Sequence, residues 1–355
     1  MTASSLSLHW TDTEREHAFK AWLATLPDEL GLDAGSLRVA SADASFRRYL
    51  RLDSAQGPRI VMDAPPAHED CGPFVKIAAL LRSGGLDAPE VLHWDSEHGF
   101  MLLDDLGDTT FLTALAGRDA RAAAPLYIAA IDALVRLQGI DPADARAAGV
   151  ADYDRALLRR ELDLFPDWYI ARHCGYTSSD AQRAQLERTF ELILDACTAQ
   201  PGVLVHRDYH SRNLMLCAGD GAAPGILDFQ DAVWGPITYD LASLLRDAYI
   251  EWDEDVQIDW AVRYWERARK AGLPVDADFG AFWRDFEWMG LQRHLKVLGI
   301  FARLSHRDGK HGYLRDLPLV WRYAHRVASR YANLQPLAVL LEDLAGAERR
   351  TGYTF

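Results

Sequence analysis

The sequence predicts an α+β protein with a small, β-rich N-terminal lobe and a large, mainly α-helical C-terminal lobe. Two observations indicate this fold. Short alternating or β-branched runs dominate the first hundred residues, whereas long segments with helical apolar periodicity follow them. A chain of 355 residues is long enough for two lobes. We expect residues 1–103 to form the N-terminal lobe, 104–107 a hinge, and 108–355 the C-terminal lobe.

The N-terminal lobe is expected to begin with a helix that runs to about Leu26, because Thr11 and Glu14 have the spacing of a capping box. Later, residues 73–82 repeat apolar side chains at helical spacing, and a Gly-Gly pair follows as a stop signal. The β-rich runs lie at 46–52, 59–62, 91–94 and 100–103. This part of the chain therefore predicts a small sheet with one or two helices.

The C-terminal lobe is expected to consist mainly of helices. A hydrophobic content of 49%, with 11 Trp residues, indicates a well-packed core. Six segments carry helix-like apolar periodicity: 120–139, 154–172, 180–199, 255–271, 279–304 and 313–332.

A polar motif interrupts this helical half at residues 206–213, with the pattern H-x-D-x-x-x-x-N. A short apolar run before the motif predicts a strand that delivers Asp208 onto a loop. After the motif, two short apolar runs flank a glycine-rich turn, which predicts a β-hairpin. These runs are 214–217 and 225–227. Such a hairpin would bring Asn213 close to Asp228, which follows its second strand.

These three polar side chains have the chemistry of phosphoryl transfer. A carboxylate such as that of Asp208 can orient an attacking hydroxyl and accept its proton. An amide oxygen and a second carboxylate, from Asn213 and Asp228, suit the hard, octahedral Mg²⁺ that bridges ATP phosphates. The motif therefore predicts a kinase-type site that uses ATP and Mg²⁺, with Asp208 as the catalytic base.

Two other interpretations of the motif remain open at this point. The acidic and amide residues could be turn formers that follow a buried strand. Alternatively, His206, Asp208 and His210 could hold a transition metal, but no further His, Cys or Glu cluster completes a site of the usual ligand count. His206 is better explained as a structural histidine that supports the loop, and His210 has no assigned role.

The motif and its surroundings resemble the aminoglycoside phosphotransferase superfamily, which includes choline, homoserine and sugar kinases. The resemblance covers nearly the whole chain and implies a bilobal protein-kinase-like fold. More narrowly, the chain is similar to the anomeric sugar kinases of bacterial peptidoglycan recycling, which act on N-acetylmuramate and N-acetylglucosamine. The superfamily resemblance rests on residues 205–213, 227–229 and 235–242, and the narrower one on 43–52, 60–66, 229–236 and 292–296.

The resemblance implies a role for each matching residue of the catalytic motif. Asp208 would be the catalytic base, and Asn213 and Asp228 would bind Mg²⁺. Asp240 would act as a buried brace that accepts hydrogen bonds from the backbone of the catalytic loop, with His206 as a second support. Asp240 could also, or instead, cap the helix that follows it.

In the N-terminal lobe, the resemblance implies a turn over the ATP phosphates near residues 44–47 and a hinge whose backbone contacts adenine. Two departures stand out: Met62 lies where a strand lysine is expected, and the turn lacks glycine. Since ATP phosphates need a nearby cation, neighbouring arginines are candidates, although they could simply decorate an exposed strand face. The expected nucleotide-binding residues are Ser45, Phe46, Arg47, Arg48, Arg51, Leu103, Asp105 and Leu106.

We expect the acceptor pocket in the helical lobe, near Asp208. Aromatic rings can stack on a sugar, while Arg, Asp and Gln side chains can hydrogen-bond hydroxyl, acetamido or carboxylate groups. An aromatic-rich helix can equally belong to the core. The candidate substrate-binding residues are Arg212, Arg246, Asp247, Tyr249, Trp288, Gln292 and Arg293.

The resemblance implies phosphorylation of the anomeric hydroxyl of N-acetylmuramic acid, N-acetylglucosamine or both, giving a sugar 1-phosphate for cell-wall recycling. Two alternatives stay open. The acceptor could be an aminoglycoside, choline or homoserine. The chain could also be an inactive kinase fold that serves as a binding protein.

Composition limits the partners and the compartment. A net charge of −14 argues against nonspecific binding to nucleic acid, which requires many cations. The four cysteines, at 71, 174, 197 and 217, show no paired spacing, which favours a reducing compartment. No leader or apolar run of about 18 residues is present. We expect a cytoplasmic monomer whose partner is a small-molecule amino sugar.

Overall fold

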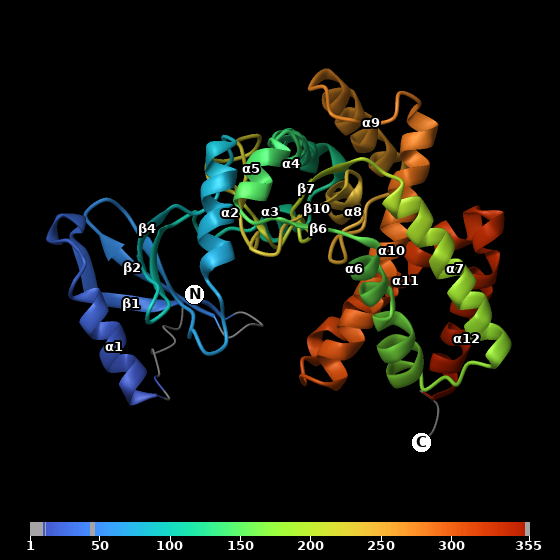
Figure 1. Cartoon of the computed structure of the whole chain (residues 1–355), viewed down its shortest axis with the longest axis horizontal. Helices are drawn as coiled ribbons and strands as arrows, with labels where there is room; N and C mark the ends of the chain where they lie inside the picture. Colours follow the sequence, from blue (N-terminus) through green and yellow to red (C-terminus); the bar gives the residue numbers. More distant parts are fainter. Residues whose placement is uncertain (1–9, 11, 43–46, 352–355) are drawn as a thin grey trace.

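The computed structural model describes residues 10, 12–42 and 47–351. Its N-terminal part is built on a five-stranded antiparallel sheet with the strand order β1-β2-β3-β5-β4. Figure 1 shows this sheet with helix α1 at one end of an elongated molecule, and the C-terminal helices at the other end. The strands are β1 (Leu32–Ala42), β2 (Arg48–Ser54), β3 (Arg59–Asp63), β4 (Val91–Asp95) and β5 (Phe100–Asp104).

Each face of the sheet packs on a different partner, because side chains alternate along a strand. Val61 and Leu102 lie on the face covered by α1 (Thr13–Leu23), where they form a cluster with Phe19. The neighbouring Met62 and its cross-strand partner Met101 lie in the other cluster, which also contains helix α2 (Gly72–Ser83). Met62, which replaces the expected lysine, is therefore a core residue.

The predicted strands and the helix at 73–82 are present, with two differences in detail. Strand β1 was not predicted, because its Ala, Gly and Ser residues have weak β propensity. The first helix ends at Leu23, and its N-cap is Asp12, whose side chain accepts a hydrogen bond from Arg15 N. Thr11, Ser45 and Phe46 lie outside the described residues.

The remaining chain is mainly helical, as predicted. The longest helix, α10, spans 28 residues and is buried along most of its length, because several of the other helices pack against it. The helices are α3 (Phe111–Leu115), α4 (Ala120–Gln138), α5 (Pro142–Ala147), α6 (Arg155–Leu162), α7 (Asp180–Thr198), α8 (Tyr239–Leu245), α9 (Glu254–Lys270), α10 (Phe279–His306), α11 (Leu317–Arg330) and α12 (Gln335–Thr351). Short 3₁₀ segments are η1 (Asp28–Leu30), η3 (His311–Asp316) and η4 (Ala332–Leu334).

The helix expected at 154–172 is divided into two elements. Helix α6 ends at Leu162, and a π-helical segment, η2, follows at Phe165–His173. Pro166 explains the division, since it has no amide hydrogen to donate to the carbonyl of Leu162. The helix expected at 313–332 likewise begins later, at Leu317.

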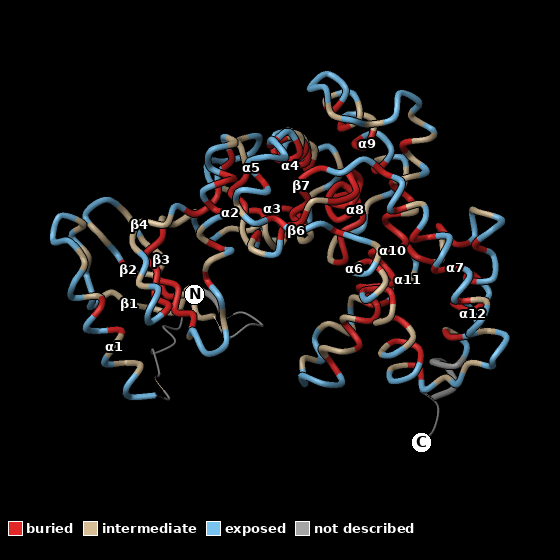
Figure 2. The backbone as a smooth tube through the Cα atoms, viewed as in Figure 1, coloured by how far each residue is buried: buried red, intermediate tan, exposed pale blue. Residues whose placement is uncertain are grey.

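Two small β-structures carry the catalytic motif. The strands β6 (Ala151–Asp152), β10 (Val233–Pro236) and β7 (Gly202–Val205) form one sheet, and β8 (Leu214–Met215) pairs with β9 (Gly225–Ile226) in a hairpin. The core beneath them is continuous with that of the N-terminal sheet. Figure 2 shows buried backbone running from β3 through α2 and α4 to α8 and α10.

Within the described part of the chain, none of the helices has the length and apolar character needed to cross a membrane.

Candidate active site

The loop that carries the catalytic motif leaves β7 at Val205. Asp240 supports the first residues of this loop. This carboxylate is fully buried at the start of α8 and accepts hydrogen bonds from the backbone amides of His206 (2.7 Å) and Arg207 (3.0 Å). Arg207 has a φ of 76°, a conformation that costs free energy for a residue with a side chain. The two hydrogen bonds offset that cost. Asp240 lies inside the helix, after the N-cap Thr238, so it acts as a brace and not as the cap.

A second carboxylate, Asp247, holds the far side of the loop. One of its oxygens accepts a hydrogen bond from Ser211 N and the other from Tyr249 N, both at 3.0 Å. Asp247 was predicted to bind substrate, but the structure commits both of its oxygens to the protein backbone.

Asp208 lies between these two supports, and surrounding cations keep it ionised. Burial raises the pKa of the Asp208 carboxyl, but the positive charges of Lys296 and Arg293, together with the neighbouring His210 ring, outweigh burial and leave the pKa below its usual value. His206 receives a hydrogen bond from Asp208 N at its Nδ1, and burial lowers the pKa of its ring to about 4. The loop therefore combines an anionic carboxylate with a neutral histidine at neutral pH.

The hairpin brings Asn213 and Asp228 together, as predicted. Leu214 pairs with Ile226, and Leu227 N donates to Asn213 O (2.9 Å), so the two polar residues flank the same end. Asn213 Nδ2 donates to Asp208 O (2.9 Å) and lies 3.4 Å from Asp228 Oδ2. Asp228 has a φ of 64° and accepts a hydrogen bond from Gln230 (2.8 Å).

This donor set fits Mg²⁺. The amide nitrogen of Asn213 faces the protein, which leaves its oxygen and the Asp228 carboxylate as hard oxygen donors. Mg²⁺ is commonly held by one or two such groups together with substrate phosphates. Among the residues that the structure describes, no group of three or more His, Cys, Asp or Glu side chains could hold a metal ion. The alternative of a transition-metal site at His206, Asp208 and His210 is therefore not supported.

A cleft of about 360 Å³ adjoins these residues. Strand residues of the N-terminal sheet form one wall, and the hairpin end with Asn213 and Asp228 forms the other. The segment predicted to be the hinge borders it at Leu103, Asp105 and Leu106, three residues predicted to contact the nucleotide. The remaining lining residues are Ala40, Tyr49, Arg51, Ile60, Phe74, Pro89, Asp104, Gly107, Asp108, Thr110, Arg212, Met215, Leu227 and Phe229.

The three arginines expected to grip the ATP phosphates all have carboxylate partners. Arg47 pairs with Glu69 (3.0 Å), and Arg48 pairs with the fully buried Asp63. Arg51 pairs with Asp105 of the hinge (2.5 Å) and donates to Gly107 O (2.8 Å). Only Arg51 of the three lines the cleft.

The candidate acceptor residues fall into two groups. Arg212, Tyr249 and Arg293 lie around the catalytic loop. The Arg212 guanidinium lies 3.7 Å from the centroid of the Tyr249 ring. Arg293 is only 4% exposed and is close enough to Asp208 to lower the pKa of its carboxyl. Its Nη1 has no hydrogen-bond partner in the described part of the chain.

The other predicted acceptor residues are occupied elsewhere in the helical core. Arg246 is fully buried and donates to Glu287 (3.0 Å), so its charge is not available to an acceptor. Trp288 packs against Tyr331 (5.6 Å between ring centroids). Gln292 donates to Glu161 (3.2 Å).

A buried ion network behind the loop was not predicted from the sequence. Glu161 of α6 accepts from Arg207 (2.6 Å) and forms an ion pair with Lys296 of α10 (2.9 Å). Lys296 also donates to Tyr239 (2.9 Å), the neighbour of Asp240. Lys296 lies in the segment 292–296, on which the narrower family resemblance partly rests. This resemblance was the one signal that could have pointed to Lys296. No local pattern marks Glu161.

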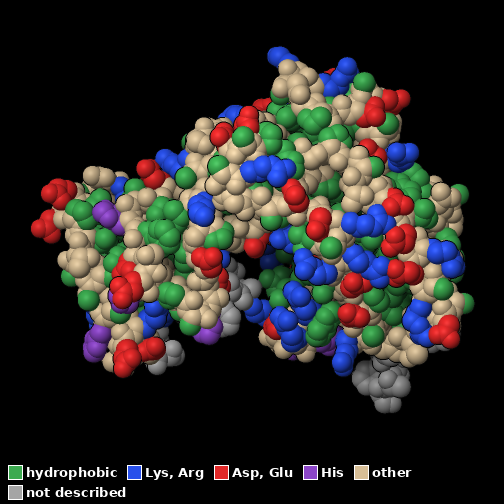
Figure 3. Space-filling model, viewed as in Figure 1, with side chains coloured by type: hydrophobic (Ala, Val, Ile, Leu, Met, Phe, Trp, Pro, Cys, Tyr) green, Lys and Arg blue, Asp and Glu red, His purple; other side chains and the backbone are tan. Residues whose placement is uncertain are grey.

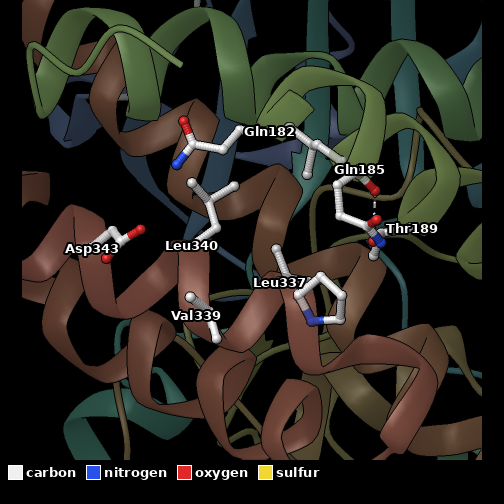
Figure 4. A pocket seen from close by; sticks show the side chains of 9 residues that line it. Gln182, Gln185, Thr189, Leu337, Val339, Leu340 and Asp343 are labelled. Carbon is white, nitrogen blue, oxygen red and sulfur yellow. Dashed lines mark hydrogen bonds between the residues drawn. The ribbon is translucent and has the colours of Figure 1, made fainter. Parts of the chain in front are cut away.

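A second, smaller cavity lies between α7 and α12 (Figure 4). It measures about 70 Å³, and its lining contains Gln182, Leu340 and Asp343 but no residue of the catalytic motif. The larger cleft is therefore the candidate active site. Figure 3 shows the surface hollowed between the two ends of the molecule, with Lys and Arg side chains gathered on the helical side.

The sheet, the hinge, the braced loop and the paired oxygen donors together define a phosphotransferase of the protein-kinase-like class. The chain belongs to the phosphotransferase enzyme family, whose sequence profile matches residues 36–279. It is 47% identical to an N-acetylmuramate/N-acetylglucosamine kinase from Neisseria meningitidis serogroup B over 345 residues, covering 96% of this chain and 100% of the relative. The kinase of the same name from Pseudomonas putida is 46% identical over 342 residues, which cover 96% of both chains.

Solved structures with little sequence identity share the fold. The GDP complex of wild-type aminoglycoside 2'-phosphotransferase-IIIa aligns with a TM-score of 0.59 at 15% identity, covering 90% of this chain and 100% of that one. An ethanolamine kinase from Plasmodium vivax aligns with a TM-score of 0.61 at 10% identity, covering 89% of each chain.

Proposed function

We propose that this enzyme transfers the γ-phosphoryl group of ATP to the anomeric hydroxyl of N-acetylmuramic acid, N-acetylglucosamine or both. The product is the sugar 1-phosphate, and the reaction serves cell-wall recycling in the cytoplasm. The observation that carries the proposal is the Asp208–Asn213–Asp228 arrangement beside a cleft, in a chain nearly half identical to kinases of that name.

In this mechanism Asp208 orients the sugar hydroxyl and accepts its proton, because its neighbours keep the carboxylate ionised. Asn213 and Asp228 would hold Mg²⁺, which neutralises charge on the ATP phosphates when it is bound. Asp240 and Asp247 keep the loop backbone in place. Leu103, Asp105 and Leu106 border the adenine, and Tyr249 and Arg293 lie on the acceptor side.

An acceptor screen tests the proposal. The purified enzyme is given Mg·ATP with each amino sugar, and with an aminoglycoside, choline and homoserine as alternatives. We expect turnover with one or both amino sugars and, by ³¹P NMR, a phosphate on the anomeric oxygen. A phosphate on another hydroxyl, or turnover only with the alternative acceptors, would contradict it.

Substitution of the catalytic base tests the mechanism. Asp208→Asn should lower kcat by about 100- to 10,000-fold, the usual contribution of a general base. ATP affinity should change little, because the amide has the shape of the carboxylate. The exposed Asp231→Asn in the same region is the matched control and should retain activity. Preserved turnover in Asp208→Asn would refute the assigned role.

A further inference from the structure

The cleft contains a cation, Arg212, that forms no ion pair with a described carboxylate; the Asp316 carboxylate interacts with its charge from beyond ion-pair distance. Arg51 and Arg212 are the two basic residues in its lining. Arg51 is held by Asp105 and by the carbonyl of Gly107. Within the described ranges, the Arg212 side chain has neither a hydrogen bond nor an ion pair, and its close contact is the Tyr249 ring.

The protein holds Arg212 in this state with a dedicated support. Asp247 accepts hydrogen bonds from Ser211 N, the residue before Arg212, and from Tyr249 N, the residue whose ring lies under the guanidinium. A ring face orients a planar guanidinium without cancelling its charge or occupying its donors. The centroid of a second ring, that of Tyr313, lies 5.8 Å from the Arg212 guanidinium carbon. The side chain is therefore positioned while its N–H groups stay available.

The location of Arg212 indicates which ligand it meets. It precedes Asn213 directly, and both line the cleft with Asp228. Phosphoryl transfer spreads negative charge over the transferred group, and kinase-type sites place a cation there. The lysine expected at position 62 is a buried methionine, and Arg47 and Arg48 are paired with carboxylates away from the cleft lining.

We propose that Arg212 binds the phosphoryl group that is being transferred, and that it supplies from the loop the charge that the buried Met62 cannot provide. This revises its predicted role as a sugar contact and rests on the proposed kinase function. A planar guanidinium can donate two parallel hydrogen bonds to phosphate oxygens, which a lysine cannot.

The test compares ATP with ADP, because only ATP carries the transferred group. Binding is measured by calorimetry with Mg²⁺ in an Asp208→Asn background, so that ATP is not consumed. Arg212→Gln should weaken ATP binding by about 10- to 100-fold, the usual loss for charge-assisted hydrogen bonds. ADP binding and sugar binding should each change less than about threefold by the same reasoning.

Three further variants sharpen the comparison. Arg212→Lys should give an intermediate loss of ATP affinity, because it keeps the charge without the fork. Tyr249→Leu should also weaken ATP, since it removes the ring under the guanidinium. Arg263→Gln, on an exposed arginine paired with Asp259, is the control and should bind ATP normally. Unchanged thermal midpoints without ligand show that the variants are folded.

An unchanged ATP affinity in Arg212→Gln would overturn the proposal, as would an equal loss for ATP and ADP. A loss of sugar binding alone would instead make Arg212 an acceptor contact. The nucleotide comparison does not depend on the identity of the sugar, so failure of the proposed acceptor in the screen would remain distinguishable.

Discussion

At the scale of single residues, the charge of Asp208 depends on cations that are themselves buried. Lys296 is 7% exposed and Arg293 is 4% exposed, and both lower the pKa of the Asp208 carboxyl. A carboxyl group buried without them would retain its proton near neutral pH. Lys296 is partly neutralised by Glu161, whereas no carboxylate pairs with Arg293 among the described residues. Arg293 is therefore the sharper test of this electrostatic arrangement.

We expect Arg293→Gln to move the acidic limb of the pH profile of kcat/KM to higher pH. Loss of the cation lets burial raise the pKa of Asp208, by about one to two units for a nearby charge. Activity that requires the ionised carboxylate is then lost at a higher pH as the solution is acidified. Arg263→Gln serves as the surface control. An acidic limb that stays in place would show that Arg293 does not set this pKa.

The polar residues of the motif were predictable because their spacing is local. A strand, a loop and a tight hairpin fix Asp208, Asn213 and Asp228 within 21 positions of the chain. Arg246 was misassigned because helical periodicity does not reveal whether a polar residue faces a ligand or another buried charge. Glu161 was missed because it meets Arg207 across 46 residues, a contact that only tertiary packing creates.

At the scale of elements, the close packing of α10 against η2 depends on one glycine. A Cβ added at Gly299 would lie 2.4 Å from the backbone carbonyl of Leu164, which cannot move without shifting the chain that enters η2. The division of this region into α6 and η2 was not predicted, because apolar periodicity alone does not distinguish a π-helix from an α-helix.

Gly299→Ala should lower the free energy of unfolding by about 1–3 kcal/mol, the usual effect of overpacking. Gly290→Ala is the matched control on the same helix, because its nearest contact would be an ordinary 3.7 Å. It should be neutral or stabilising by up to about 1 kcal/mol, since alanine favours a helix. Urea unfolding measures both. Equal effects of the two substitutions would contradict this account of the packing.

At the scale of the whole molecule, residues of the N-terminal sheet and of the C-terminal, mainly helical part border the same cleft. The sheet and residues 103–107 supply one wall, and the hairpin end with Asn213 and Asp228 supplies the other. The bilobal fold was predictable from the change in periodicity near residue 105. The ion pairs of the arginines at 47, 48 and 51 were not predictable, because their carboxylate partners come from other strands and loops.

Nucleotide should stabilise the folded enzyme only when the metal is present. At about 100 times its Kd, a ligand adds about 2.7 kcal/mol to the free energy of unfolding. We expect ATP with Mg²⁺ to raise the thermal midpoint by several degrees, and ATP with EDTA to have a much smaller effect. Asp228→Asn should abolish the difference between the two conditions. A Mg²⁺-dependent shift that survives in Asp228→Asn would exclude that carboxylate as a metal ligand.

The packing of α2 against the segment that follows the hairpin has a consequence for how the chain can be divided. The ring centroids of Phe74, in α2, and Phe229, the residue after Asp228, are 4.9 Å apart. Both residues are buried in one core that extends from Met62 to Phe286. A fragment cut after Leu103 would carry only a minor part of that core and expose it to water. The N-terminal part is thus not an interchangeable module, and grafting it onto another kinase would require the facing hairpin and α2 to be exchanged together.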